Sequence, residues 1–222
     1  MRIFDRLTSI YAPHCCVLCN SEGSLVCRWC MPDLQPNRAS VCYVCNKLTD
    51  DCRVCSTCRS KSSLLQVWIH SRYEGAIKDL VRGLKYERKT SAVVVLAQLL
   101  DELLPYFATP PLITFVPTTT SRRRQRGYDH AALLARQLAK LRGWEFAPSL
   151  MRLDKTRQVG SSRKERLSNK IEYRVCTEIK GRTILLVDDV VTTGSTIELA
   201  AKSLRNAGAT HVSAAVLASN RS

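Results

Sequence analysis

Two adjacent aspartates at the end of an apolar stretch are the residues best suited to chemistry in this chain. The stretch LLVDDVVTTGST spans residues 185–196, so Asp188 and Asp189 follow three apolar residues and precede a turn of small polar residues. Such a turn lets backbone N–H groups and hydroxyls converge on an anion, and the following helix adds the positive end of its dipole. The pattern predicts a sugar-phosphate site, with the phosphate in the turn and the sugar hydroxyls on the acids. The predicted phosphate-binding residues are Thr192, Thr193, Gly194, Ser195 and Thr196.

This stretch has two alternative interpretations. A strand that ends in two aspartates also holds Mg²⁺ in nucleotide triphosphatases, but those proteins need an upstream G-x-x-x-x-G-K-[ST] motif. No Gly-Lys pair occurs in this chain. A turn with incidental acids is the second alternative, but unpaired neighbouring carboxylates are costly without a cation or hydrogen-bond donors. The 12 consecutive positions instead resemble the phosphoribosyl-pyrophosphate (PRPP) motif of type I phosphoribosyltransferases.

A PRPP site also needs a loop for pyrophosphate and a cover that excludes water. Residues 116–130 offer hydroxyls, N–H groups and guanidinium groups, which donate to phosphate oxygens in pairs. The predicted pyrophosphate ligands are Thr118, Thr119, Thr120, Arg122 and Arg126. Residues 152–174 are polar and basic with little apolar periodicity, so we expect a lid there, with an ordinary exposed loop as the alternative. The lid residues singled out are Gln158, Arg166 and Asn169.

The cysteines are concentrated near the start of the chain. Ten of the 11 lie between Cys15 and Cys58, and eight of them form four C-x-x-C pairs. This spacing lets two thiolates wrap one tetrahedral zinc ion, and four protein ligands leave no open position for a substrate. Two successive structural zinc sites fit best, with Cys15 and Cys52 surplus; an interleaved pairing, a His14 ligand and redox-active thiols stay open. The predicted zinc ligands are Cys16, Cys19, Cys27, Cys30, Cys42, Cys45, Cys55 and Cys58.

Two compositional units must position these residues. Residues 1–60 form the cysteine-rich unit, with a short amphipathic helix before the first cysteines; residues 59–65 are predicted to be a linker of low order, and residues 66–222 a second domain. In that domain we expect strands over 67–73, 112–117, 182–190 and 210–218, and helices over 74–86, 91–104, 130–142 and 195–207. Alternating strands and helices predict an α/β fold whose parallel sheet is covered on both faces.

Composition restricts the class of protein. The chain carries 34 Lys and Arg against 19 Asp and Glu, a net charge of +15, which attracts polyanions and phosphorylated small molecules or simply gives a soluble basic surface. An aromatic content of 6% does not indicate a long base-stacking platform. We find no apolar run long enough to span a bilayer and no secretory signal, and therefore expect a cytoplasmic protein.

Several motifs occur together in one order along the chain. The cysteine-rich start is followed by LKY (84–86), RRRQRGYDHAALLA (122–135), TRQVGSSRKERLSN (156–169) and the aspartate stretch. This order resembles the ComF family of competence-associated proteins, which join a zinc-finger segment to a type I phosphoribosyltransferase-like domain. The chain departs from the family's usual Asn-Gln at Asp129-His130, so the role of this pair is open.

The resemblance implies a cytoplasmic protein that takes part in DNA uptake and natural transformation, with single-stranded DNA and competence proteins as partners. It also implies that PRPP binds together with Mg²⁺, that Asp188 and Asp189 act on the ribose hydroxyls and the cation, and that a phosphoribosyl group is transferred to an acceptor the sequence does not identify. Two alternatives stay open: a single-stranded-DNA-binding competence factor, and a PRPP sensor without catalysis.

Overall fold

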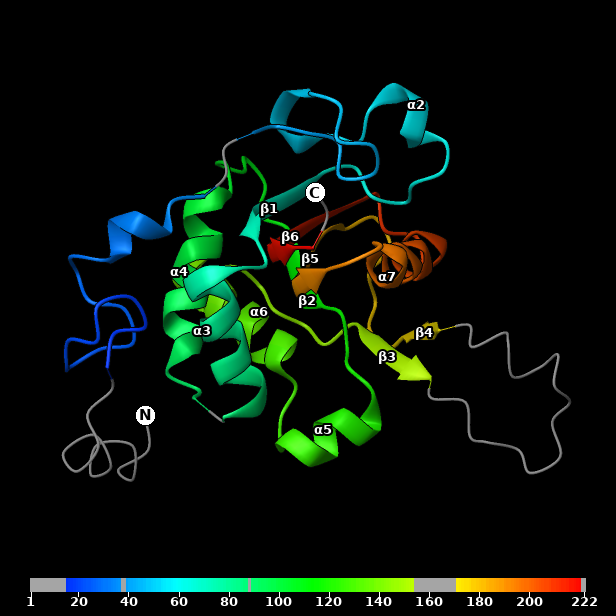
Figure 1. Ribbon diagram of the computed structural model, residues 1–222. Helices are drawn as coiled ribbons and strands as arrows, with labels where there is room; N and C mark the ends of the chain where they lie inside the picture. The colour runs from blue at the N-terminus through cyan, green and yellow to red at the C-terminus, as the bar shows by residue number, and fades with distance from the viewer. Residues whose placement is uncertain (1–14, 37–38, 88, 154–170, 221–222) are drawn as a thin grey trace, which may run out of the picture.

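A four-stranded parallel sheet, with strand order β1–β6–β5–β2, forms the centre of the structure (Figure 1). The computed structural model describes residues 15–36, 39–87, 89–153 and 171–220. The strands are β1 (Val67–Arg72), β2 (Leu112–Phe115), β5 (Thr183–Val191) and β6 (His211–Ser219). The central strands β5 and β6 are buried over nearly their whole length, as parallel strands covered on both faces require.

Alternate side chains of β5 point into two separate cores. Leu185 and Val187 pack with the helices α3 (Gly75–Tyr86), α4 (Ala92–Leu103) and α6 (His130–Arg142) on one face. Ile184 and Leu186 pack with α7 (Ser195–Asn206) on the other face. The predicted strands and helices of the α/β part are all present with small shifts at their ends, so the predicted covered parallel sheet is confirmed.

The pairing register determines which loops meet. Phe115 of β2 lies opposite Val187 of β5, and Val187 lies opposite Ala215 of β6. The residue after β2, Val116, donates its N–H to the Val187 carbonyl at 3.0 Å. The chain that leaves β2 therefore runs directly beside Asp188 and Asp189.

A two-stranded antiparallel hairpin was missed by the sequence analysis. Strands β3 (Leu150–Leu153) and β4 (Glu172–Val175) pair across a stretch expected to be a loop without regular structure. Each strand has only four residues, too few for a periodic signal, and its register depends on Leu150 and Tyr173 packing into the core beneath α7. The predicted lid residues Gln158, Arg166 and Asn169 fall between the two strands and lie outside the described residues.

The cysteine-rich segment packs against the α/β part on both sides of the sheet. Its first half, with the short helix η1 (Met31–Leu34), packs through Cys16, Leu25 and Val26 into the core of α3 and α4. Its second half, with η2 (Asp50–Cys52) and α2 (Ser56–Arg59), packs through Tyr43 and neighbours into the core of α7. The predicted amphipathic helix before the cysteines lies outside the described residues.

The expected low-order linker over residues 59–65 is wrong. The Arg59 guanidinium donates to the Leu64 carbonyl at 2.5 Å, and the Leu65 N–H donates to the Val212 carbonyl at 2.8 Å. Leu64 is fully buried. The polar residues of this stretch suggested a linker, but Leu64 packs in the core with α7. No helix in the described parts of the chain has the length and apolar character needed to cross a membrane.

Leu138 on α6 provides a test of how this core is built. Its side chain is fully buried between α6 and its neighbours, whereas Leu141 on the same helix is 43% exposed. Leu138→Ala should lower the free energy of unfolding by about 2–5 kcal/mol, because it removes a buried isobutyl group and leaves a cavity. Leu141→Ala should change it by less than about 1 kcal/mol. Urea unfolding followed by circular dichroism measures both, and equal losses would contradict the described packing of α6.

Candidate functional site

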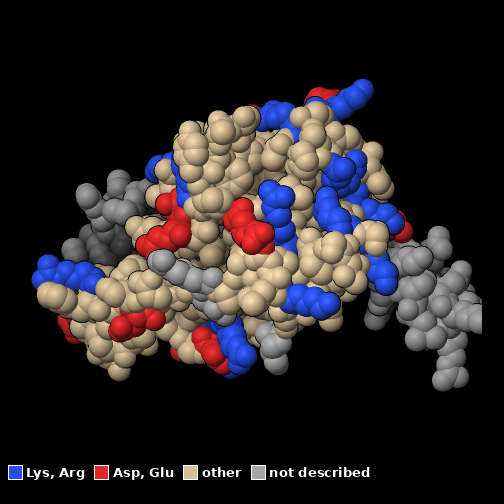
Figure 2. All heavy atoms as spheres, turned by 90° about the horizontal axis from the view of Figure 1, so that it is seen from above, with Lys and Arg blue, Asp and Glu red and all other residues tan. Residues whose placement is uncertain are grey.

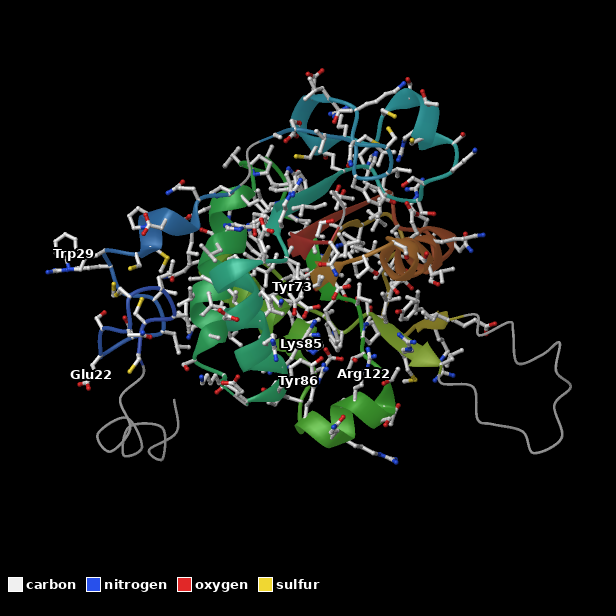
Figure 3. All side chains as sticks on the ribbon, viewed as in Figure 1. Glu22, Trp29, Tyr73, Lys85, Tyr86 and Arg122 are labelled. Atoms are coloured by element: carbon white, nitrogen blue, oxygen red, sulfur yellow. The ribbon has the colours of Figure 1, made fainter. Side chains whose placement is uncertain are left out.

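A cavity of about 220 Å³ opens at the carboxyl ends of β2 and β5. Open parallel sheets bind ligands at this edge, because the loops that leave the strands surround a crevice there. The polar residues that line the cavity are Lys85, Tyr86, Thr118, Arg122, Arg126, His130, Arg152, Asp188, Asp189, Thr192 and Thr196. Figure 3 shows Lys85 and Tyr86 at the end of α3 reaching the same region as Arg122. Four separate stretches of the chain, residues 85–86, 116–130, 152 and 188–197, thus contribute to one cavity.

Asp189 is a buried carboxylate that side chains from two helices contact. It is 4% exposed, and its Oδ2 contacts Lys85 Nζ from α3 and His130 Nε2 from α6, the latter at 3.3 Å. Its Oδ1 accepts the Val190 N–H at 2.8 Å. Burial alone would raise the pKa of Asp189, but its contacts with His130 and Lys85 lower the pKa below the ordinary value. Asp189 is therefore held as an anion.

Asp188 lies in a different electrostatic setting. Its Oδ1 accepts the Asp189 N–H at 2.9 Å, and no ion pair to its carboxylate is described. Burial, and then the charge of Asp189, raise the pKa of Asp188 well above its ordinary value. The pair therefore combines one compensated carboxylate with one that gains from an added cation or hydroxyl donor.

The turn between β5 and α7 has the conformation that an anion site needs. Gly194 adopts a left-handed conformation (φ 83°) at the head of the 12-residue helix α7, so the backbone can bend sharply there. Thr192, Gly194 and Thr196 line the cavity. The hydroxyls of Thr193 and Ser195 lie 2.9 Å apart, and these residues line a neighbouring hollow instead. The backbone N–H groups at the start of α7 and the threonine hydroxyls are the groups there that can donate hydrogen bonds to an anion.

The stretch 116–130 is only partly a loop, which corrects the prediction. Residues Thr120–Arg126 form the short helix α5, capped by Thr119, whose side chain accepts the Arg122 N–H, and closed by left-handed Gly127. Thr118, Arg122 and Arg126 line the cavity, but Thr119 and Thr120 do not. Thr119 before the arginines is a signal for the start of a helix, and Gly127 after them is a signal for its end.

Asp129 and His130, whose role the sequence left open, have structural partners. Asp129 accepts the Thr118 N–H at 2.9 Å and the Ala131 N–H at 3.1 Å, so it caps α6 and fixes the start of the loop. Nδ1 of His130 lies 3.0 Å from Arg126 Nη1 and must accept, because a guanidinium only donates. His130 thereby joins Arg126 to Asp189 across the cavity floor.

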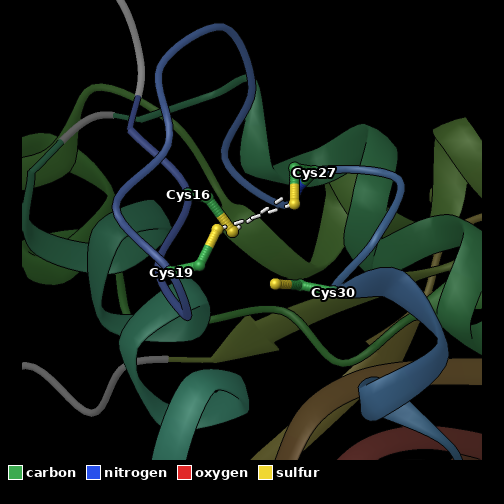
Figure 4. A group of neighbouring side chains, drawn as sticks. All are labelled: Cys16, Cys19, Cys27 and Cys30. Carbon is green, nitrogen blue, oxygen red and sulfur yellow. Dashed lines mark hydrogen bonds between the residues drawn. The ribbon is translucent and has the colours of Figure 1, made fainter.

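The eight paired cysteines form two separate groups of four. One group is Cys16, Cys19, Cys27 and Cys30 (Figure 4), and the other is Cys42, Cys45, Cys55 and Cys58. In each group the sulfur atoms lie within 4.8 Å of one another, which excludes the interleaved pairing for the described residues. Cys15, Cys52 and the exposed Cys176 belong to neither group, and His14 lies outside the described residues.

The sulfur positions fit a tetrahedral metal ion. Cys19 Sγ lies 3.7 Å from Cys27 Sγ, and Cys45 Sγ lies 3.5 Å from Cys55 Sγ. A zinc ion with Zn–S bonds near 2.3 Å would separate its sulfur ligands by about 3.8 Å. The first C-x-x-C pair of each group is followed by an asparagine in the left-handed conformation, Asn20 or Asn46. The two sequences match, CVLCN and CYVCN, and asparagine tolerates this conformation better than most residues.

The thiols within each group differ in pKa. Burial alone would raise the pKa of Cys16, but the N–H groups of Cys27, Cys19 and Leu18 lower it to about 6. The neighbouring thiols of Cys19 and Cys27 hold the pKa of Cys30 above its ordinary value. Four thiolates at this separation repel one another, and a divalent cation removes the conflict.

Comparison with known proteins places the chain in a family. The phosphoribosyl transferase domain family matches residues 124–222. The competence protein ComFC of Streptococcus pneumoniae is 25% identical over 200 residues, 88% of each chain. The DNA utilization protein YhgH of Salmonella typhimurium is 30% identical over 214 residues, which cover 89% of this chain and 94% of that protein. The chain belongs to the ComF family.

A further relative supports the assignment over part of the chain. Competence protein F of Haemophilus influenzae is 38% identical over 108 residues, 45% of this chain and 46% of that protein. The predicted fold of this ComF protein is confirmed: a parallel sheet of the type I phosphoribosyltransferase kind, with a cysteine-rich segment that can hold two metal ions.

Four polar cavity residues of this ComF protein were missed from the sequence: Lys85, Tyr86, His130 and Arg152. Lys85 lies in the LKY motif, and His130 in the pair whose role was open, so both stood within recognised motifs without an assigned partner. Arg152 stands opposite Tyr173 in the hairpin that was not predicted. Their distance in sequence from the aspartates gave no sign of contact.

Proposed function

We propose that this ComF-family protein binds PRPP together with Mg²⁺ and transfers its 5-phosphoribosyl group to an acceptor. The observation that carries the proposal is the meeting of three elements in one cavity: the aspartate pair, the phosphate turn and the arginines of α5. A phosphate monoester, a sugar diol and a pyrophosphate need these three kinds of group in this proximity.

The parts of PRPP have natural positions in the cavity. The 5′-phosphate faces the turn, with Thr192, Gly194 and Thr196 nearest, and Thr193 and Ser195 supporting the turn from outside. The ribose hydroxyls face Asp188 and Asp189. The pyrophosphate faces the Thr118 side of the cavity with Arg122 and Arg126, whose guanidinium groups pair with phosphate oxygens.

The reaction breaks the bond from ribose C1 to the pyrophosphate oxygen and forms a bond from C1 to the acceptor atom, which loses its proton. Positive charge develops on the ribose ring, and the aspartates stabilise it through the hydroxyls they hold. Oxygen ligands suit Mg²⁺, and Asp188 is the less compensated carboxylate, so the residues fit the cation. Bound Mg²⁺ would neutralise the leaving pyrophosphate.

The cellular setting of the proposal comes from the relatives. One carries the name DNA utilization protein and two are named competence proteins. We infer a cytoplasmic role in DNA uptake and natural transformation, with single-stranded DNA and competence proteins as partners.

Asp188→Asn tests the cation and ribose site most cleanly. The variant should lower the affinity for PRPP in Mg²⁺ by at least about tenfold, roughly 1.4 kcal/mol, in isothermal titration calorimetry. Asp189→Asn is a less specific test, because it leaves Lys85 and His130 without their carboxylate partner and so affects the fold as well. Unchanged PRPP affinity in Asp188→Asn, with an intact fold by circular dichroism, would end the proposal.

The raised pKa of Asp188 adds a pH dependence to the same experiment. A cation needs the ionised carboxylate, so the affinity should keep rising with pH above the range where an ordinary aspartate, with pKa near 3.9, is fully ionised. Binding should release a proton, seen as a heat that differs between buffers of different ionisation enthalpy. Asp188→Asn should lose this extra release, which separates it from titration of the ligand's phosphates.

Pyrophosphate release with candidate acceptors then distinguishes a transferase from a sensor that only binds.

We also propose that both cysteine groups hold structural zinc. Purified protein should contain close to two zinc ions per chain by elemental analysis, and a strong chelator should lower its thermal stability, because metal binding stabilises a segment with little core of its own. Cys176→Ser, outside both groups, should keep both ions. A content of one ion or none would contradict the assignment.

A second candidate function, binding of single-stranded DNA, is favoured by the distribution of charge. On the face that carries the second cysteine group, basic and acidic residues are interspersed (Figure 2). In contrast, α5 carries four arginines in seven residues, of which Arg123 and Arg124 are exposed and lie outside the cavity. These two side chains are available for a polyanion when the cavity is filled.

Salt dependence tests this candidate. Replacing Arg123 and Arg124 by Gln should reduce the slope of log affinity for single-stranded DNA against log salt by about 1.4, since each phosphate contact contributes roughly 0.7. Replacing the exposed Lys180 and Lys202 by Gln is the matched control with the same charge change. Equal effects of both double variants would show that only net charge matters.

A further inference from the structure

Glu198, in the first turn of α7, receives three donors from the second half of the cysteine-rich segment. Its Oε1 accepts hydrogen bonds from the hydroxyls of Tyr43 and Ser62, the latter at 2.5 Å. Its Oε2 accepts the Ser63 N–H at 2.9 Å. Ser62 also lies close to Tyr43, with the two hydroxyls 3.4 Å apart. A single carboxylate thus fastens the helix to two different parts of the segment.

Both parts are close in sequence to cysteines of the second group. Tyr43 directly follows Cys42 and precedes Cys45, so it stands inside the first C-x-x-C pair of that group. It is 3% exposed and packs in the core that includes α7. Ser62 and Ser63 follow the last ligand, Cys58, by four and five residues. Metal binding would draw the two ends of this short segment together at one centre.

Glu198 is also joined to the phosphate turn. Its own N–H donates to the Gly194 carbonyl at 3.0 Å, the first hydrogen bond of α7. Thr193, Gly194 and Ser195 share a hollow with Tyr43, Cys58 and Glu198, so the outer side of the turn faces the cysteine group directly. The inner side of the same turn lines the cavity through Gly194.

The hydrogen bonds of Glu198 keep its carboxylate from competing with a phosphate bound at the start of α7. A carboxylate in the first turn of a helix competes with a bound phosphate for the N–H groups and the positive end of the dipole. Here the three donors satisfy the Glu198 carboxylate on the far side of the turn, which leaves the helix terminus to the ligand.

We propose that the second cysteine group is a positioning device for the 5′-phosphate site, acting through Tyr43 and Glu198. The inference rests on the proposed binding of PRPP and adds that metal occupancy at Cys42, Cys45, Cys55 and Cys58 sets the affinity of the turn for the phosphate. The first cysteine group packs instead in the core of α3 and α4, on the opposite face of the sheet from α7.

Two ligands separate the phosphate turn from the rest of the cavity. Ribose 5-phosphate reports on the turn, and pyrophosphate with Mg²⁺ reports on the arginine side. Glu198→Gln and Tyr43→Phe should each lower the affinity for ribose 5-phosphate about fivefold, because each weakens the hydrogen bonds that join Glu198 to the cysteine-rich segment. The affinity for Mg²⁺-pyrophosphate should stay the same. Glu102→Gln and Tyr106→Phe make the same chemical changes at exposed positions and should affect neither ligand.

A pair of cysteine variants tests the role of the metal. Cys45 and Cys19 occupy equivalent exposed positions in the two groups, and replacing either by Ser should remove one metal ion by elemental analysis. Cys45→Ser should weaken ribose 5-phosphate binding at least fivefold in calorimetry, and Cys19→Ser by less than twofold.

The outcomes separate this inference from the function on which it rests. Wild-type protein that binds neither ligand would remove the proposed function itself. Wild-type binding with equal losses in Cys45→Ser and Cys19→Ser, or with no selective loss in Glu198→Gln and Tyr43→Phe, would overturn the positioning role alone. A general loss of stability would lower the affinity for both ligands together, which the Mg²⁺-pyrophosphate measurement detects.

Discussion

The structure depends on how it keeps a buried carboxylate charged. Asp189 stands at the end of the central strand, almost out of contact with water, and Lys85 and His130 reach it from two different helices. Removing a charge from water costs several kcal/mol unless partners replace the lost hydration. This requirement makes the packing of α3 and α6 on the sheet part of the site itself.

The same contact organises the rest of the cavity. His130 also bonds Arg126, so the carboxylate is linked to the arginines of α5, and Asp129, one residue earlier, holds the Thr118 N–H. The shape of the proposed pyrophosphate side is thus set by the beginning of α6. Asp188 has fewer partners and a raised pKa, so a nearby cation would stabilise its ionised carboxylate. One aspartate of the pair is suited to maintain the site, and the other to meet a ligand.

The cysteine-rich segment is built into this architecture on both sides. One group of four packs with α3 and α4, and the other packs with α7, so the segment crosses the edge of the sheet at β1. Its first half packs in the core that contains α3, and Lys85 lies near the end of that helix. Its second half contacts α7, which begins at the turn proposed to bind phosphate. A segment that looked like a separate unit thus packs against two helices, α3 and α7, that contribute residues to the cavity.

The sequence by itself determined the alternation of strands and helices, the aspartate stretch with its small-residue turn, and the four closely spaced C-x-x-C pairs, whose division into two groups the structure then decided. These features are local: burial on both faces removes polar residues from a strand, and a tetrahedral metal site needs closely spaced thiols. Only the tertiary structure decided that Lys85 and His130 meet Asp189, that Thr118 and not Thr120 faces the cavity, that a hairpin brings in Arg152, and that Glu198 joins Tyr43. Those pairs lie far apart in the chain or depend on a cap and a register, and they form only when packing of the two cores brings their elements together.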